Sequence, residues 1–391
     1  MTAINPLLVA TDAPPIPEAR AWTRRYAGAL GPLVDLSQAA PGAPPPPEML
    51  ARLGLTAADP EAARYGDIAG DPALREAYAG AVAALYGGAV AADEVAITAG
   101  CNQGFFVAMM ALARAAEAVI LPTPWYFNHK TTLDMLGIAA VPLPCTEASG
   151  FVPDVDAAER LIDRRVRAIV LVTPNNPTGA ICPPETIARF AALCRRRGIG
   201  LVLDETYRDF LPAAGARPHA LFSESGLRAG FIQLYSFSKA YGIPGHRVGA
   251  MVADSGTIGE VVKVLDNLQI CAPRAPQMVL PWAIGALAAW REAGRVEIAK
   301  RGAAFGRMLA DVPGWRIDSI GAYFAYVRHP CGDLPAAAVA ERLAVERGVL
   351  CLPGSYFGPW QEGHVRIAIA NVDAATIAGL GPRFVGLGAP R

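Results

Sequence analysis

Residues 236–250 read SFSKAYGIPGHRVGA and place one lysine, Lys239, between small hydroxyl residues and a run of glycines. Ser236, Ser238 and Arg247 are side chains that can bind a phosphate, and the glycines and proline between them shape a loop. A lysine is a good nucleophile when its amine is neutral, as in a desolvated site or one with cationic neighbours. The alternative is a solvated surface lysine followed by a turn. The stretch therefore indicates a reactive lysine beside an anion site, provided that other segments supply suitable neighbours.

The lysine stretch follows one of several apolar runs that are rich in valine, isoleucine and leucine. Six of these runs predict buried strands: EVAITAG (94–100), AVILPTP (118–124), RAIVLVTP (167–174), GLVLDETY (200–207), FIQLYSFS (231–238) and RVGAMVAD (247–254). Helical patterns such as DPALREAYAGAVAALYG (71–87, with Asp71 as N-cap) and PPETIARFAALCRRRG (183–198) lie between them. This alternation is typical of an α/β protein with a largely parallel sheet covered on both faces.

The two ends of the chain differ from this central part. Residues 1–45 are rich in proline, which prevents regular strand pairing, so we expect an arm that joins a smaller domain. Residues 46–285 are expected to form the large domain. Residues 286–391 are expected to form a small C-terminal α+β domain, with a long helical stretch over 276–309 leading to short strands at YFAYVRH (323–329) and HVRIAIA (364–370).

Composition narrows the functional classes. The 391 residues are 53% hydrophobic, and Lys+Arg and Asp+Glu both number 35, so no net charge indicates nucleic acid or a membrane surface. The seven cysteines include no CxxC pair, which favours free thiols over a zinc ribbon or disulfides. The N-terminus lacks the pattern of a signal peptide, and the apolar stretches are too short or too charged to span a bilayer. We therefore expect a cytoplasmic protein without nucleic-acid or membrane partners.

Polar or aromatic residues follow five of the predicted strands, where ligands bind in an open parallel sheet. Asp204 ends an apolar run, where a carboxylate is costly without a cation or hydrogen bonds; a helix cap or a buried salt bridge would explain it equally well. NNPTG (175–179) is a turn signal by itself. GCNQG (100–104) opens a helix whose free N–H groups suit a phosphate, although most such turns bind nothing. Taken together, the five strand ends predict one site.

Pyridoxal 5′-phosphate (PLP) requires a lysine, a phosphate cup, a carboxylate for its pyridine nitrogen and donors to its ring hydroxyl. With these residues the sequence resembles the class I/II aminotransferases of PLP fold type I, the aspartate aminotransferase superfamily. SFSKAYGIPGHRVG, VTPNNPTG and DETY carry the resemblance, which extends over nearly the whole chain. It implies an α/β large domain, with a mostly parallel seven-stranded sheet between helices, plus a smaller α+β domain.

The resemblance also implies roles for individual residues. Lys239 would form the aldimine and carry the proton, Asp204 would hold the pyridine nitrogen protonated, and Tyr207 would complete the catalytic set. Arg366 and Asn176 would bind the substrate. The implied cofactor contacts are Gly100, Cys101, Asn102, Tyr126, Asn176, Asp204, Tyr207, Ser236, Ser238, Lys239, Arg247 and, from the partner subunit of a homodimer with shared active sites, Tyr65.

Three details qualify these roles. Trp125 competes with Tyr126 for stacking on the ring. Cys101 and Asn102 stand where the family often has a small hydroxyl residue, so the side-chain roles there are weaker than those of the backbone amides. His129, His246 and His364 lie near these motifs without a required task.

The predicted function is transfer of an amino group from an L-amino acid to a 2-oxo acid through the Lys239 aldimine, in amino-acid metabolism or biosynthesis. A PLP-dependent lyase, cyclase or oxidase would use the same residues and the same quinonoid intermediate. A PLP-sensing regulator is disfavoured, because about 30 proline-rich residues precede the core and no basic excess marks a DNA-binding domain.

Overall fold

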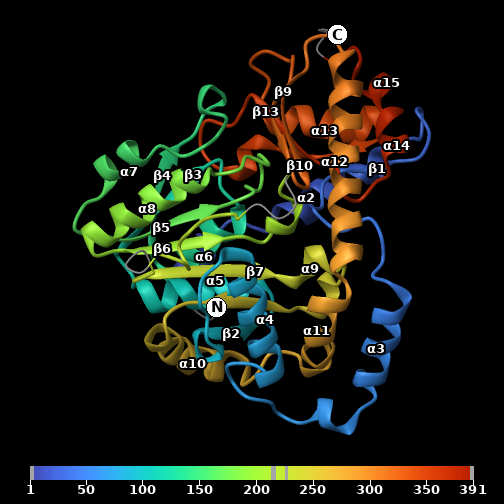
Figure 1. Cartoon of the computed structure of the whole chain (residues 1–391). Coiled ribbons are helices and arrows are strands. Elements are labelled where there is room, and N and C mark those ends of the chain that lie inside the picture. The colour runs from blue at the N-terminus through green and yellow to red at the C-terminus, as the bar shows by residue number, and fades with distance from the viewer. Residues whose placement is uncertain (1–3, 213–216, 225–227, 388–391) are drawn as a thin grey trace.

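The structure is a computed structural model that describes residues 4–212, 217–224 and 228–387. Its larger part is built on a seven-stranded sheet (Figure 1). In spatial order the strands are β2 (Val95–Thr98), β8 (Gly249–Val252), β7 (Phe231–Ser236), β6 (Gly200–Asp204), β5 (Val166–Val172), β3 (Ala118–Thr123) and β4 (Ala139–Pro144). Strand β8 pairs antiparallel with β2 and β7, and the other neighbours pair in parallel. The predicted α/β class with a mostly parallel seven-stranded sheet is confirmed.

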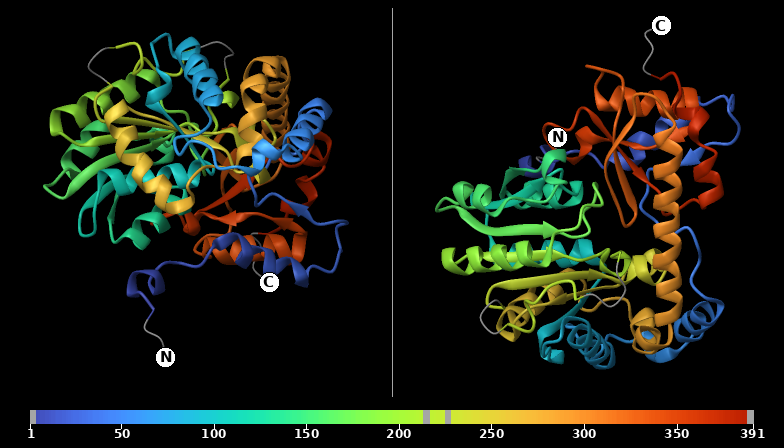
Figure 2. Two further views of the ribbon diagram at one scale, coloured as in Figure 1. Left: turned by 90° about the horizontal axis from the view of Figure 1, so that it is seen from below. Right: turned by 45° about the horizontal axis from the view of Figure 1, so that its top comes forward.

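Helices cover both faces of this sheet (Figure 2). In β5, Ile169 and Leu171 pack into one apolar core and Ala168 and Val170 into another, because successive side chains of a strand point to opposite faces. The first core includes side chains from α4 (Pro72–Tyr86), α7 (Val155–Leu161), α8 (Pro184–Arg197) and α11 (Arg274–Ala286). The second includes side chains from α5 (Cys101–Leu112), α6 (Phe127–Leu136) and α10 (Ser255–Gln269).

A second, four-stranded sheet forms the smaller part of the molecule. Its antiparallel order is β12 (Leu352–Pro353), β13 (His364–Ala368), β10 (Phe324–Arg328) and β9 (Arg316–Gly321). Its apolar core also takes side chains from α12 (Ala288–Ala310), α13 (Ala336–Arg347), α14 (Ala374–Ala378) and α15 (Gly381–Phe384). Helix α12 runs along one side of the molecule from the large sheet to the small one (Figure 1).

The N-terminal region contains α1 (Pro6–Val9), α2 (Pro15–Trp22), β1 (Val34–Asp35) and α3 (Pro47–Ala57). The expectation that this proline-rich region avoids regular pairing is wrong at one point. Strand β1 pairs in parallel with β11 (Val349–Leu350), and Leu36 packs into the core of the small sheet. The reason is local, because residues 33–40 between the two proline-rich pieces contain no proline.

Three further details differ from the sequence-based expectation. Strand β4 (AAVPLP) was not predicted. Asp71 occupies the N-cap position of α4, but its side chain accepts no capping hydrogen bond and instead pairs with Arg274 Nε at 3.0 Å. The helical stretch over 276–309 is divided into α11 and α12 at Leu287, whose ψ of 17° departs from helical geometry.

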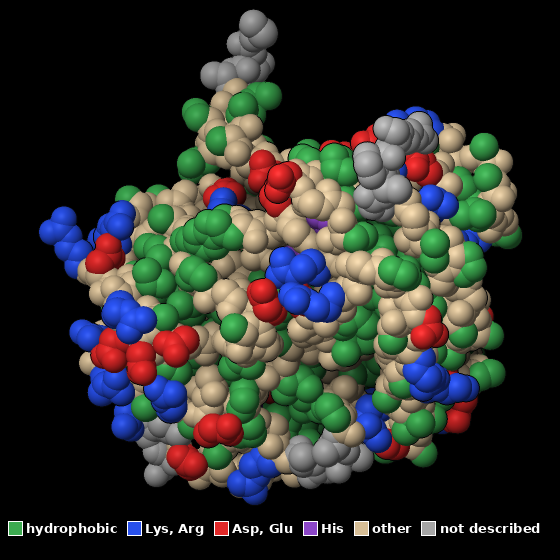
Figure 3. All heavy atoms as spheres, turned by 90° about the horizontal axis from the view of Figure 1, so that it is seen from above, with side chains coloured by type: hydrophobic (Ala, Val, Ile, Leu, Met, Phe, Trp, Pro, Cys, Tyr) green, Lys and Arg blue, Asp and Glu red, His purple; other side chains and the backbone are tan. Residues whose placement is uncertain are grey.

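Three further observations concern the surface charge, the cysteines and the apolarity of the helices. On the face shown in Figure 3, acidic and basic side chains are interspersed rather than gathered into one patch. All seven cysteines are free thiols, and six of them are buried. In the part of the chain that the structure describes, no helix is both long enough and apolar enough to cross a membrane.

Candidate active site

A cavity of about 140 Å³ lies at the carboxyl ends of the parallel strands. It takes side chains from the ends of β5, β6 and β7 and from the start of α5, as the strand-end argument predicts. Its walls are formed by Cys101, Asn102, Tyr126, Val172, Asn176, Asp204, Thr206, Tyr207, Ser236, Ser238, Lys239, Pro244 and Arg247. The structure thus brings most of the predicted site residues together, although they come from five separate segments.

Lys239 lies in the short helix α9 (Phe237–Ala240), immediately after β7. Its Nζ donates a hydrogen bond to the carbonyl of Ala39 in the N-terminal arm. Burial, followed by the positive charges of Arg366 and Arg247, lowers the pKa of the Lys239 amine to about 8. A substantial fraction of this amine is therefore neutral near physiological pH and able to act as a nucleophile.

Asp204 ends β6 and is 4% exposed. Its carboxylate lies 3.3 Å from His129 Nε2 and accepts a hydrogen bond from the Thr206 N–H at 2.9 Å. Burial alone would raise the pKa of Asp204, but the hydrogen bonds and charge of His129, together with Thr206, hold that pKa below its usual value. The His129 ring is in turn fixed by stacking on Phe105, with ring centres 3.9 Å apart. The site therefore holds a buried carboxylate in its ionised form.

The start of α5 forms a turn with features of an anion site. Gly100 precedes the helix with φ +81°, and a Cβ at this position would lie 2.2 Å from Arg247 Nη2. Arg247 donates hydrogen bonds to the carbonyls of Ala99 and Pro244. Ser238 Oγ is buried without a hydrogen-bond partner among the described residues. An arginine, a free hydroxyl and the N–H groups of a helix N-terminus therefore converge on one point.

Arg366 of β13 extends from the small sheet toward the cavity. It is 2% exposed, and burial lowers its pKa to about 10. Nη1 donates to Asn176 Oδ1 at 3.1 Å, Nη2 donates to the carbonyl of Ser37, and Nε has no partner among the described residues. Phe324 and Phe357 lie against the guanidinium. A buried arginine that has neutral acceptors and an unused donor is suited to bind a carboxylate.

Two predicted aromatic residues lie in different places. Tyr126 lines the cavity, where its hydroxyl accepts a hydrogen bond from Asn128 Nδ2 at 2.8 Å. The competing residue Trp125 lines a separate cavity beside the N-terminal arm. Tyr65 is 77% exposed and does not reach the cavity of its own chain.

An amine, an anion turn and a buried carboxylate at three points of one cavity match the functional groups of PLP, and the two sheets are those of a fold type I PLP-dependent enzyme. The chain belongs to the class I and II aminotransferase family, whose model matches residues 32–380.

Two relatives illustrate this membership, and one solved structure illustrates the shared fold. The arginine–pyruvate transaminase AruH of Pseudomonas aeruginosa is 30% identical over 311 residues, which cover 78% of this chain and 77% of the relative. The valine–pyruvate aminotransferase of Mycobacterium tuberculosis is 29% identical and covers 87% of each chain. The structure of a Thermus thermophilus aspartate aminotransferase mutant has a TM-score of 0.90 at 24% identity, over 99% of this chain and 100% of that one. This protein is therefore a PLP-dependent aminotransferase that transfers amino groups from amino acids to 2-oxo acids, as predicted.

The residues present also suit PLP on structural grounds. The Ser238 hydroxyl has no partner among the described residues, and the Arg247 side chain fills the space that a side chain at position 100 would need, so both would suit the phosphate group. The lowered pKa of Lys239 would suit the amine that reacts with the PLP aldehyde, and the ionised Asp204 would suit a partner of the ring nitrogen.

The sequence reasoning missed several residues of this site. His129 contacts Asp204, although it was assigned no required task. Thr206 lines the cavity beside it. The carbonyls of Ser37 and Ala39 bring the N-terminal arm to the site. A signal existed for His129, since it follows the PTPWY strand end by three residues, but nothing in the sequence singled it out from the other histidines.

Proposed function

We propose that Lys239 holds the cofactor and moves the proton at the substrate Cα. Bound PLP supplies an electron sink that stabilises negative charge at this carbon. The observation that carries the proposal is the convergence of Lys239, Asp204 and Arg247 on one cavity, with Arg366 bonded to its wall at Asn176. An amine with a pKa of about 8 is able both to accept and to return a proton near neutral pH.

The remaining residues orient and stabilise the cofactor. Asp204, held ionised by His129, keeps the ring nitrogen protonated. Burial raises the pKa of Tyr207, which keeps its hydroxyl protonated and able to donate to the ring oxygen together with Asn176. Tyr126 stacks on the ring. The residues proposed to bind the phosphate are Gly100, Cys101, Asn102, Ser236, Ser238 and Arg247.

Arg366 is proposed to bind the α-carboxylate of the L-amino acid, with Asn176 beside it. An amino acid and a 2-oxo acid both carry this carboxylate, so one arginine serves both half-reactions. Phe324 and Phe357 exclude water from the guanidinium, which strengthens such an ion pair.

A half-reaction with the purified holoenzyme tests the proposal. The enzyme is mixed with one amino acid in the absence of any 2-oxo acid that could accept the amino group. The cofactor absorbance is then expected to change to that of the pyridoxamine form, and one equivalent of 2-oxo acid is expected to be released per site. Arginine, valine, aspartate and an aromatic amino acid form the first panel, because relatives are named for such substrates. The Lys239→Ala variant should lack both signals. Turnover by this variant, or release of ammonia, peroxide or a cyclised product, would contradict the assignment.

We also propose a homodimer in which Tyr65 of the partner subunit completes each phosphate site. The 77% exposure of Tyr65 and its absence from the residues that line the cavity of its own chain support this arrangement. Lys239→Ala and Tyr65→Ala chains, mixed after unfolding, should regain activity beyond either parent, because mixed dimers carry one intact site. Unchanged activity in the mixture, or a monomer by light scattering, would contradict the shared site.

The division into an arm (1–45), a large domain (46–285) and a small domain (286–391) remains our proposal. Two separate sheets with separate apolar cores support it. A cytoplasmic location is likewise proposed, and the seven free cysteines fit a reducing compartment.

A further inference from the structure

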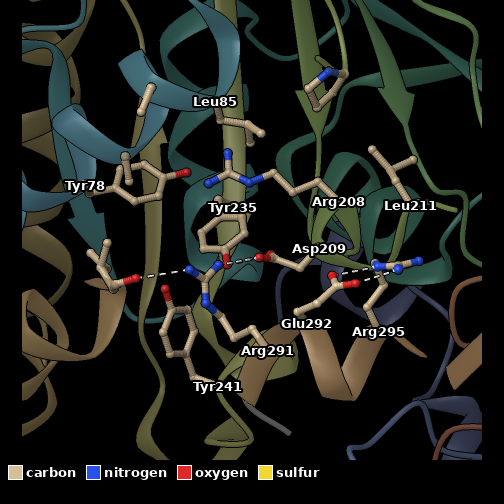
Figure 4. Close-up of a pocket in the computed structure, with 14 residues that line it drawn as sticks. Tyr78, Leu85, Arg208, Asp209, Leu211, Tyr235, Tyr241, Arg291, Glu292 and Arg295 are labelled. Atoms are coloured by element: carbon tan, nitrogen blue, oxygen red, sulfur yellow. Dashed lines mark hydrogen bonds and ion pairs between the residues drawn. The ribbon is translucent and has the colours of Figure 1, made fainter. Parts of the chain in front are cut away.

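A second cavity of about 520 Å³ lies on the face of the large sheet that α4 and α11 cover (Figure 4). Arg208 and Asp209, which line it, directly follow Tyr207, and Tyr235 directly precedes Ser236. In β7 and in the segment after β6, neighbouring residues therefore line two different cavities: one residue lines the cofactor cavity and its neighbour lines the second cavity. None of the residues that line the second cavity lines the cofactor cavity.

Arg208 is the unusual residue of this second cavity. It is 8% exposed, and its guanidinium carbon lies 4.0 Å from the ring centre of Tyr235 and 5.4 Å from that of Tyr78. Its hydrogen bond to Tyr86 Oη is long, at 3.4 Å. Within the described residues, no carboxylate oxygen of Asp or Glu lies within 4.0 Å of its nitrogens. Burial would lower the pKa of this guanidinium, but the surrounding tyrosines and the charge of Asp209, which acts from beyond ion-pair distance, raise that pKa, so Arg208 stays charged while it lacks a direct carboxylate partner among these residues.

The carboxylates that line the cavity are already engaged. Asp209 accepts from Arg291 Nη1 and from the Tyr235 hydroxyl, each at 2.8 Å. Glu292 pairs with Arg295 at 2.6 Å. Their charges are therefore balanced without Arg208.

One further carboxylate lies nearby, behind the wall of the cavity. Glu205 accepts a hydrogen bond from the Tyr86 hydroxyl at 2.6 Å and lies 3.5 Å from His219 Nε2. It reaches Arg208 only through that tyrosine and does not line the cavity. The guanidinium edge that borders the cavity thus lacks an acidic partner.

Part of the cavity wall is apolar. Ala81, Ala84 and Leu85 of α4 and Ile284 of α11 line it. A volume of about 520 Å³ is within the range of small-molecule sites. The cavity therefore combines an arginine that has no direct carboxylate partner among the described residues with an apolar surface.

We propose that this cavity binds a small organic acid, with its carboxylate on Arg208 and an apolar body against α4 and α11. The planar fork of an arginine matches a carboxylate in two parallel hydrogen bonds. A free amino acid fits less well, because Asp209 and Glu292 already have arginine partners, which weakens their attraction for its ammonium group. Inorganic phosphate would leave the apolar wall unused.

Calorimetric titration of the holoenzyme with 4-methylpentanoate tests this proposal. An Arg366→Gln background removes carboxylate binding at the active site, and one equivalent per chain is expected to bind to it. Addition of Arg208→Gln should weaken this binding by about tenfold to a hundredfold, the range for hydrogen bonds to a charged group. The neutral 4-methylpentanamide and inorganic phosphate should bind at least tenfold more weakly.

A second variant tests the cavity independently, in case the Arg208→Gln variant does not fold. Ala84 is exposed on α4 and lines the cavity, so Ala84→Trp should fill the cavity without disturbing the core and should also abolish binding. Circular dichroism and the cofactor absorbance are expected to match those of the parent protein. Undiminished binding in Ala84→Trp or Arg208→Gln, equal binding of the amide or of phosphate, or no binding in the Arg366→Gln background would overturn the proposal.

Discussion

Replacement of Lys239 by methionine tests the claim that the fold holds this amine against its preference for water. In the cofactor-free protein, the charged lysine destabilises the folded state because burial and two arginines disfavour its ammonium form. Methionine has a similar length and no charge. We therefore expect Lys239→Met to be more stable than the natural protein at neutral pH.

The size and the sign of this effect follow from the pKa. A fall from the ordinary value of 10.5 to about 8 corresponds to about 3 kcal/mol, at about 1.4 kcal/mol per pH unit. We take this as the upper limit, because Lys239 retains some solvent exposure. The folded pKa lies below the unfolded one, so the unfolded chain binds more protons between pH 8 and 10.5. The penalty is complete below about pH 8 and disappears as the pH rises through 10.5.

Urea unfolding of both proteins at a fixed chain concentration measures this difference. The advantage of Lys239→Met should shrink by up to about 3 kcal/mol between pH 7.5 and pH 11. Packing differences between lysine and methionine shift the curves equally at each pH, so the change with pH isolates the difference between the charged and the neutral amine, its hydrogen bond to the Ala39 carbonyl included. A stability difference that stays constant with pH would refute the reasoning.

Three further predictions concern the cofactor and the substrate. Gly100→Ala should weaken PLP binding at least tenfold in an absorbance titration, because the φ of +81° strains alanine and the new Cβ displaces Arg247; unchanged affinity would contradict the proposed phosphate turn. His129→Phe keeps an aromatic ring but loses the contact with Asp204, so the pKa of this carboxylate should rise. In a plot of kcat against pH, the fall of activity on the acid side should then occur at higher pH. If the acid side of this plot does not move, His129 does not set the pKa of Asp204. Arg366→Lys should raise KM about tenfold to a hundredfold for amino and 2-oxo acids alike, and a change confined to kcat would argue against carboxylate binding.

The sequence predicts that the polar groups at the strand ends of the large sheet lie close together, and the reason is physical. Asp204, Asn176 and Lys239 follow apolar runs, and parallel strands bring their carboxyl ends to one edge of the sheet. The place of Arg366 beside Asn176 depends on how the four-stranded sheet packs against the seven-stranded sheet, so the family resemblance rather than a local pattern indicated it. His129 was not assigned a role because its ring is positioned by stacking on Phe105 of a different helix, a contact that sequence spacing does not reveal.

Other omissions have different causes. Strand β4 contains two prolines, and the rule that proline disfavours strands holds less strictly at the edge of a sheet, where β4 lies. Ser37 and Ala39 contact the site through backbone carbonyls, which every residue possesses and no motif can mark. The Lys239 amine is predictable as a nucleophile, but its supporting contact in the arm is not.

The pairing of β1 has a consequence for the way in which the N-terminus can be shortened. Val34 donates a hydrogen bond to the Gly348 carbonyl, Ser37 accepts one from Arg366, and Ala39 accepts one from Lys239. A deletion that ends before Val34 leaves all three contacts in place. Each step beyond it removes, in order, the hydrogen bond to Gly348, the hydrogen bond that holds Arg366 and the hydrogen bond that holds Lys239.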